Sequence, residues 1–251
     1  NNLNDNLPLF TSSSSFSADE NQTAIGSVTA TDADGDSVTY TASGSDILID
    51  SGTGVIAFSS APDYETKISF TSTVTATDGL NSSTQDITIA VNNLNDNSPV
   101  LASVTDFTID ENTSAVGTIS GSDADGDVLE YLINGTDADS LSIDSGSGVL
   151  SFNETTDYET KTSYSLNVVI NDGVNSVTNA ATISINNLND NSPIFSSAET
   201  FSIAENESSI GTASATDADT GSSVSYSVDN SVNQKVEVSV AANANGSGNV
   251  Y

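Results

Sequence analysis

The stretch N-N-L-N-D-N-S-P at 92–99 decides the fold, because it returns unchanged at 186–193 and, with Leu for Ser, opens the chain at 1–8. Its aspartate falls at Asp5, Asp96 and Asp190, which are 91 and 94 residues apart. Two further motifs, E-N and D-A-D, repeat at the same intervals, beginning at Glu20, Glu111 and Glu205 and at Asp32, Asp123 and Asp217. Several motifs that repeat in one register indicate tandem copies of one domain.

Two more motifs occur in the first two copies only. D-Y-E-T-K begins at Asp63 and Asp157, and D-G begins at Asp78 and Asp172. The period is longer than that of solenoid repeats and suits a small independent domain. We therefore predict a linker strip of a preceding repeat at 1–6, repeat 1 at 7–97, repeat 2 at 98–191 and a truncated repeat 3 at 192–251.

The composition excludes several classes of function. The 251 residues include 35 acidic and 3 basic side chains, for a net charge of −32, with no Cys and no His. Such a surface repels nucleic acid and anionic membranes and attracts cations. Disulfides and thiolate metal sites are excluded, and the usual general base near neutral pH is missing. No apolar run is long enough for a membrane span, so we expect no membrane insertion by this segment.

Each copy has the alternating pattern of β-strands. In the second copy Tyr164, Leu166, Val168 and Ile170 alternate with polar residues, and the corresponding part of the first copy does the same. The segments S-G-T-G-V-I-A-F and S-G-S-G-V-L-S-F are typical of a turn that leads into a strand. About seven short strands per copy favour an all-β, two-sheet sandwich, with the alternating apolar residues as its core.

The carboxylates of one copy fall into five groups, all expected in loops or at strand ends: Glu20, the pair Asp63 and Glu65, Asp96, the pair Asp32 and Asp34, and Asp78. Calcium takes six to eight oxygen ligands from carboxylates, amides and carbonyls, and N-L-N-D-N can supply all three. A solvated acidic face would explain one group, but five groups kept in register favour a metal site. An EF-hand is excluded, because Ser43 and Asn134 stand where that loop needs Glu.

The order E-N, A-T-D-A-D-G-D, G-V-I, D-Y-E, D-G, N-x-N-D-N-x-P resembles the cadherin repeat, from residue 1 to about residue 227. It is similar in particular to the bacterial cadherin-like branch, where the first linker position is often Asn, as at Asn93 and Asn187. The resemblance implies tandem seven-stranded Greek-key, immunoglobulin-like β-sandwich domains arranged as a rod. It also implies about three Ca²⁺ ions at each complete junction between repeats.

Carried onto this chain, the resemblance assigns the calcium ligands residue by residue. The first junction would use Glu20, Asp63, Glu65, Asn93, Leu94, Asn95, Asp96, Asn97, Asp123, Asp125 and Asp172, with Leu94 and Asn97 acting through their carbonyls. The second would use Glu111, Asp157, Glu159, Asn187, Leu188, Asn189, Asp190, Asn191, Asp217 and Asp219. A half site at the beginning of the chain would use Asn4, Asp5, Asn6, Asp32, Asp34 and Asp78.

Two departures from the family pattern bear on these sites. Asn in place of Asp at Asn93 and Asn187 removes one negative charge, which we expect to lower the affinity of that ion. The loop after D-A-D is also short, and the family's carbonyl ligand from this loop has no assignable residue here. The chain begins inside a repeated motif, so we expect it to be a segment of a longer protein.

The implied function is that of an extracellular structural or adhesive array whose stiffness depends on calcium. The partners would be calcium, neighbouring repeats, and other copies or cell-surface glycans, on a bacterial surface adhesin or fibre. A carbohydrate-binding module of a secreted polysaccharide-degrading protein is the alternative, although such modules usually present exposed aromatic residues. An enzyme with paired carboxylates is disfavoured, because Asp63 and Glu65 recur as Asp157 and Glu159 and tandem identical active sites are uncommon.

Overall fold

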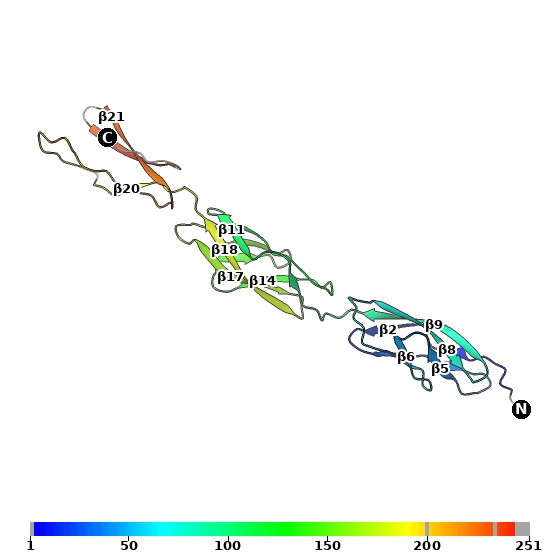
Figure 1. The fold of residues 1–251 in the computed structure, drawn as a ribbon. Helices are drawn as coiled ribbons and strands as arrows, with labels where there is room; N and C mark the ends of the chain where they lie inside the picture. Colours follow the sequence, from blue (N-terminus) through cyan, green and yellow to red (C-terminus); the bar gives the residue numbers. More distant parts are fainter. Residues whose placement is uncertain (1–2, 199–200, 233–234, 244–251) are drawn as a thin grey trace. The chain divides into compact units, whose positions relative to one another are not determined.

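The structure is a computed structural model that describes residues 3–198, 201–232 and 235–243. It is almost wholly β, and the one helix among those residues is a 3₁₀ turn, η1 (Ala138–Ser140). Figure 1 shows the strands of each repeat in sequence colours. None of the described helical structure has the length and apolar character needed to cross a membrane.

The first sandwich consists of two facing sheets of one repeat. The four-stranded sheet has the order β2-β9-β8-β5, the three-stranded sheet has the order β3-β7-β6, and β1 pairs with β4. The strands are β1 (Leu9–Phe10), β2 (Ser15–Asp19), β3 (Ala24–Ser27), β4 (Ala30–Thr31), β5 (Thr39–Ala42), β6 (Ile47–Ile49), β7 (Val55–Phe58), β8 (Ser69–Thr77) and β9 (Ser82–Asn92).

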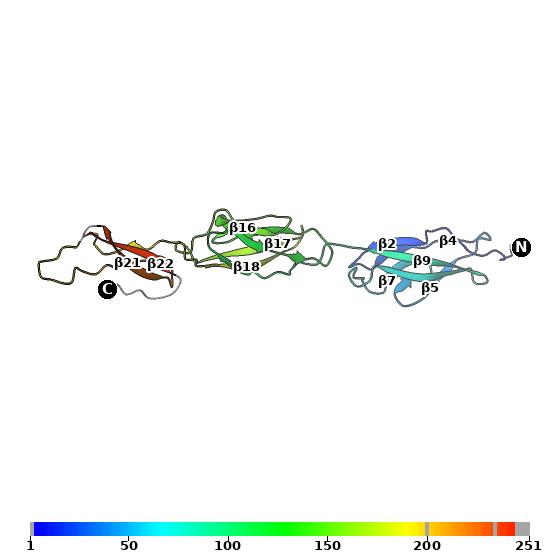
Figure 2. The same cartoon turned by 90° about the horizontal axis from the view of Figure 1, so that it is seen from above.

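The second sandwich repeats this arrangement. Its sheets have the orders β11-β18-β17-β14 and β12-β16-β15, with β10 paired to β13. The strands are β10 (Val100–Leu101), β11 (Asp106–Asp110), β12 (Ala115–Thr118), β13 (Gly121–Ser122), β14 (Glu130–Asn134), β15 (Leu141–Ile143), β16 (Val149–Phe152), β17 (Ser163–Asn171) and β18 (Ser176–Asn186). Figure 2 shows β16, β17 and β18 from a second direction.

The nine strand segments of each sandwich agree with the expected seven strands, because two strands are each divided. The first strand changes sheets: β1 pairs antiparallel with β4, and β2 then pairs parallel with β9. The second strand is interrupted between β3 and β4, at Val28, whose N–H donates to the carbonyl of Gly54. The sandwich prediction is confirmed, and the first strand is divided because its two parts, β1 and β2, pair with different strands.

Most of the predicted core residues are buried, and Tyr164 is half-buried against the core of the second sandwich. Val74, Ile87 and Ile89 of the four-stranded sheet and Ile56 of the three-stranded sheet are completely inaccessible. They form one hydrophobic cluster with Phe58, so the two sheets pack face to face. The equivalent cluster of the second sandwich joins β16 to β17 and β18 in the same way. The period-2 alternation thus reports sheet faces, as expected for a half-buried strand.

The third copy contains β19 (Ile194–Phe195), β20 (Ala215–Thr216), β21 (Ser223–Val232) and β22 (Lys235–Asn243). β19 pairs with β20 as β1 pairs with β4. The phenol oxygen of Tyr226 accepts the N–H of Ala215 at 2.9 Å, as that of Tyr40 accepts the N–H of Ala30 at 2.8 Å. The described residues of this copy supply no partner equivalent to β7 or β9, and the boundaries predicted for the three repeats remain predictions.

Glycine at position 54 is required by a close backbone approach. Gly54 has a φ of +71°, and a Cβ atom built on it would lie 2.2 Å from the carbonyl oxygen of Val28. Gly148 repeats the arrangement, with a φ of +70° and a distance of 2.1 Å to the carbonyl oxygen of Ile119. These glycines let β3 and β12 approach the turns before β7 and β16.

We therefore expect Gly54→Ala to lower the free energy of unfolding of the first sandwich by at least about 2 kcal/mol, since both a left-handed φ and a clash with backbone must be accommodated. Gly52→Ala is the matched control, because its new Cβ would meet only Asp50 Oδ1, at 3.7 Å. The control should change stability by less than about 0.5 kcal/mol. Urea unfolding followed by circular dichroism measures both, and equal stability of the two variants would contradict the packing described.

Candidate metal centre

A buried glutamate organises the acidic end of each sandwich. Glu20 is 2% exposed, and its two carboxylate oxygens accept the N–H groups of Leu94, at 2.8 Å, and Tyr64, at 2.7 Å. Glu111 is 1% exposed and accepts the N–H groups of Leu188, at 2.6 Å, and Tyr158, at 2.8 Å. A buried charge without a basic partner is costly unless it is hydrogen-bonded. The backbone supplies these bonds and thereby fixes N-L-N-D-N against the sandwich.

Four carboxylates converge around the first of these glutamates. One oxygen each from Glu20, Glu65, Asp96 and Asp125 lies within 4.8 Å of all the others, and we call this set the first cluster. The loop Asp123–Val128, which contains Asp125, belongs to the same compact unit as the first sandwich. D-Y-E, N-D-N and the D-A-D of the following copy are therefore brought together at the end of that sandwich.

Asp125, the loop aspartate of the first cluster, is hydrogen-bonded to the N-L-N-D-N linker segment. Asp125 Oδ2 accepts the N–H groups of Asp96, at 3.0 Å, and Asn97, at 2.9 Å. Its Oδ1 accepts the side-chain amide of Asn97 at 2.8 Å. Burial acts to raise the pKa of Asp125, but the hydrogen bonds from Asn97 and Asp96 outweigh it and leave the pKa below its usual value. Asp125 therefore stays ionised beside the other carboxylates.

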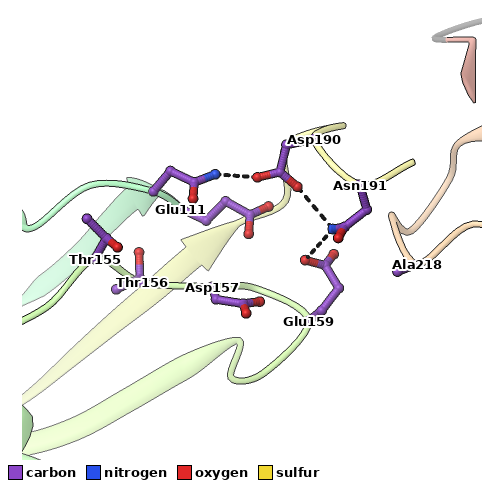
Figure 3. Close-up of a pocket in the computed structure, with 9 residues that line it drawn as sticks. Glu111, Thr155, Thr156, Asp157, Glu159, Asp190, Asn191 and Ala218 are labelled. Carbon is purple, nitrogen blue, oxygen red and sulfur yellow. Dashed lines mark hydrogen bonds between the residues drawn. The ribbon is translucent and has the colours of Figure 1, made fainter. Parts of the chain in front are cut away.

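The second sandwich carries the second cluster, formed by Glu111, Glu159 and Asp190. Figure 3 shows these three residues around a hollow that Asp157 also lines. The amide nitrogen of Asn191 lies among the acids, 3.1 Å from Glu159 Oε2 and 3.0 Å from Asp190 Oδ1. It also donates to Asp219 Oδ1 at 2.9 Å, and hydrogen bonds from Asn191 lower the pKa of Asp219.

A glutamate in each cluster is electrostatically strained. Burial raises the pKa of Glu65, and the charges of Glu20 and Asp125 add to the rise. Burial likewise raises the pKa of Glu159, with Glu111 and Asp219 as the neighbouring charges. Like charges disfavour ionisation, so each cluster favours a positive ion or a bound proton.

The D-A-D-G-D loops bring in two acids that the sequence analysis did not include. Asp36 lies in a carboxylate group with Asp32 and Asp34, and Asp127 lies in one with Asp123 and Asp125. The positive φ of the intervening glycines, Gly35 and Gly126, folds each loop back. The fifth letter of D-A-D-G-D was the available signal, and the third copy has Ser222 at the equivalent position.

Three equivalent aspartate oxygens are buried without a hydrogen-bond partner: Oδ2 of Asp32, Asp123 and Asp217. Asp32 Oδ1 accepts the N–H of Asp34 at 2.9 Å, and Asp123 and Asp217 accept the same bond at the same distance. One oxygen of each carboxylate thus orders the loop while the other lacks a donor. Buried polar atoms are rarely unsatisfied, so an oxygen-seeking cation fits this position.

The asparagine at the first linker position donates a hydrogen bond. The Asn93 amide donates to the carbonyl of Asp125 at 2.7 Å, and the Asn187 amide donates to the carbonyl of Thr220 at 3.0 Å. An aspartate there would have no hydrogen to donate. The departure noted in the sequence therefore has a local structural reason, whatever its effect on ion affinity.

Other predicted ligands lie outside the two clusters. Asp63 and Asp157 accept the hydroxyl groups of Thr66, at 3.0 Å, and Thr160, at 2.9 Å. The carbonyl of Leu94 accepts the N–H of Asp96 at 3.1 Å. Asp172 is 7% exposed and accepts the N–H of Val174 at 2.8 Å.

The predicted half site at the beginning of the chain has the same hydrogen bonds between its linker segment and its D-A-D loop as the first cluster has. Asp34 Oδ2 accepts the N–H groups of Asp5, at 3.0 Å, and Asn6, at 2.9 Å. Asn4 Oδ1 accepts the amide of Asn81 at 2.9 Å, and Asp78 Oδ1 accepts the N–H of the same residue at 2.7 Å. The six residues predicted for this half site therefore lie around one loop region of the first unit.

The two complete sandwiches have the same strand order, and each ends in a buried glutamate and an acidic linker segment. Together these features define a tandem array of immunoglobulin-like domains with candidate cation sites. No protein-family model matches the chain. Protocadherin Fat 4 of mouse is 34% identical over 195 residues, which are 71% of this chain and 4% of that protein. Human Protocadherin-23 is 30% identical over 194 residues, which are 72% of this chain and 6% of that protein.

Solved structures agree with these relatives. Mouse Cadherin-23 EC22-24 matches 95% of this chain and 88% of its own, with a TM-score of 0.72 and 23% identity, and so supports the fold. Protocadherin Gamma B2 extracellular cadherin domains 1-5 match 96% of this chain and 54% of their own, with a TM-score of 0.67 and 27% identity. The chain is composed of cadherin-type extracellular repeats and spans only a few per cent of the length of its curated relatives.

The electrostatic strain predicts a pH effect in the ion-free protein. Because the folded-state pKa of Glu65 is raised above 4.5, its proton stabilises the fold fully below pH 4.5, and this stability is lost as pH rises through the folded pKa. In chelator at pH 7, Glu65→Gln should therefore melt at a higher temperature than the unchanged protein. Glu130→Gln, at an exposed position of β14, is the control and should melt as the unchanged protein does. Lower stability of Glu65→Gln in chelator would contradict the repulsion.

Proposed function

We propose that the chain is a segment of a calcium-dependent extracellular adhesion array in which Ca²⁺ ions bind at the acidic strips between successive repeats. The first cluster carries this proposal, because its oxygens come from one repeat, its linker and the D-A-D loop of the next copy. The cadherin relatives support the assignment at the level of the family.

The chemistry of the donors favours calcium. All ligands available at the clusters are oxygens, and the chain has no His or Cys to select a softer metal. Calcium accepts six to eight oxygens in flexible geometry, whereas magnesium demands near-ideal octahedral geometry and loses water reluctantly. The buried, unpartnered Oδ2 atoms of Asp32, Asp123 and Asp217 add the hard ligands that a calcium ion would take.

Charge balance gives the proposed mechanism. Two carboxylates held 4–5 Å apart repel each other by about 3–4 kcal/mol at an effective dielectric of 20. The ligands assigned to the first junction include seven carboxylates, and about three divalent ions would nearly neutralise them. Without ions we expect this repulsion to open the linker, and with ions we expect the repeats to form a stiff rod. The ligand sets proposed are those assigned from the sequence, with Asp36 and Asp127 added.

For the parent protein we propose a cell-surface adhesin or fibre, with other copies or surface glycans as candidate partners. The bacterial assignment rests on Asn93 and Asn187, whereas the relatives reported above are animal proteins. A carbohydrate-binding module is not favoured, because among the described aromatic residues only Phe195 and Phe201 are exposed, and all the described tyrosines are buried or half-buried. An enzyme is also disfavoured, since the cadherin relatives are adhesion proteins.

The first test removes the linker aspartate. Asp96→Ala should weaken calcium binding at the first cluster at least tenfold and leave the second nearly unchanged, because the ligand is local to one strip. Calcium titrations followed by the NMR amide signals of Leu94 and Leu188 report the two clusters separately, since these amides bond to Glu20 and Glu111. Asp86→Ala is the control, because this exposed residue of β9 lies outside both clusters and accepts the hydroxyl group of Thr73. Equal loss at both clusters would refute the assignment.

Calcium should also stabilise the fold by mass action. A ligand that binds only the folded state adds RT ln(1 + [L]/Kd), or about 2.7 kcal/mol per site at a hundredfold excess over Kd. Calorimetry should show a melting temperature that rises with calcium and rises much less with equal magnesium. Equal shifts with the two ions would indicate general screening of charge rather than a calcium site.

A further inference from the structure

The asparagine of each E-N motif has an unusual backbone conformation. Asn21, Asn112 and Asn206 have φ angles of 61°, 64° and 73°, and within the described part of the chain they are the non-glycine residues with positive φ. Glycine adopts this conformation at no steric cost, and asparagine is among the few other residues that tolerate it. Asparagine rather than glycine occupies this left-handed position in all three copies, which points to a role for the side-chain amide.

The amides of Asn21 and Asn112 each reach the linker aspartate of their own unit. Asn21 Nδ2 donates to Asp96 Oδ2, and Asn112 Nδ2 donates to Asp190 Oδ2. The backbone holds each asparagine in place, since the N–H of Asn21 donates to the carbonyl of Pro62 at 3.0 Å. The N–H of Asn112 donates to the carbonyl of Thr156 at 2.8 Å. The same bond thus occurs in two copies 91 residues apart in sequence.

The aspartate is therefore held at both oxygens. Asp96 Oδ1 accepts the amide of Asn97 at 2.9 Å while its Oδ2 accepts Asn21, and Asp190 is held in the same way by Asn191 and Asn112. Two donors on one carboxylate fix the orientation of its plane. Each carboxylate oxygen has two lone pairs, so an amide and a cation can share one oxygen.

We propose that Asn21 and Asn112 are positioning residues, which orient the linker aspartates of the two clusters for a divalent cation. Without the amide, repulsion from Glu20, Glu65 and Asp125 would turn the Asp96 carboxylate outward to solvent. The buried glutamate accepts a hydrogen bond from the linker backbone, and the adjacent asparagine donates one to the linker aspartate. The E-N pair therefore holds the linker through both an acceptor and a donor. This proposal rests on the proposed calcium function and extends it to a residue that does not itself contact the ion.

Asn21→Gly tests the proposal, because glycine keeps the left-handed backbone and removes only the amide. With calcium as the probe, affinity read at the Leu94 amide by NMR should fall about tenfold or more, the usual effect of losing a residue that orients a metal ligand. Affinity read at Leu188 should not change, and Asn112→Gly should give the reverse pattern. In chelator, the melting temperature of Asn21→Gly should match that of the unchanged protein.

The outcomes separate the two proposals. If the unchanged protein binds calcium and Asn21→Gly binds it equally well, the positioning role is refuted and the calcium function stands. If Asn21→Gly also loses melting temperature in chelator, in proportion to its loss of affinity, the asparagine is structural and the positioning role again fails. If neither Leu94 nor Leu188 responds to calcium in the unchanged protein, both proposals fall.

Discussion

The structure at the acidic end of each complete sandwich is governed by the mutual repulsion of carboxylates around a buried glutamate. Glu20 and Glu111 are almost inaccessible, yet neither is hydrogen-bonded to a basic side chain; backbone N–H groups hold both. The first cluster adds three carboxylates to Glu20 and the second adds two to Glu111. Backbone and amide donors reduce the cost of this crowding, while burial, with the neighbouring charges adding to it, keeps the pKa values of Glu65 and Glu159 raised.

The hydrophobic cores make this crowding possible. Each sandwich joins its two sheets through completely buried residues such as Ile56 and Ile87, so the strand ends stay fixed while acids gather on the loops between them. Close backbone packing at Gly54 and Gly148 adds to this rigidity. The function we propose uses the resulting contrast between stable sandwiches and a linker strip whose charge depends on bound ions.

Much of this could be predicted from sequence because it depends on local pattern. The alternation of Leu166, Val168 and Ile170 predicted a buried sheet face, and those residues are buried. Motif register predicted which acids recur together. The left-handed conformation of Asn21 could not be predicted, because it depends on the bond to the carbonyl of Pro62 from a distant loop. The donor role of Asn93 likewise depends on a carbonyl 32 residues away.

The central claim, that calcium ions on the acidic strips hold successive repeats in line, is tested most directly by small-angle scattering of the chain during a calcium titration. With millimolar calcium we expect a narrow distribution of long end-to-end distances, because the neutralised linkers are stiff. With excess chelator the distribution should become broader and more compact. Identical scattering profiles in calcium and in chelator would contradict the account.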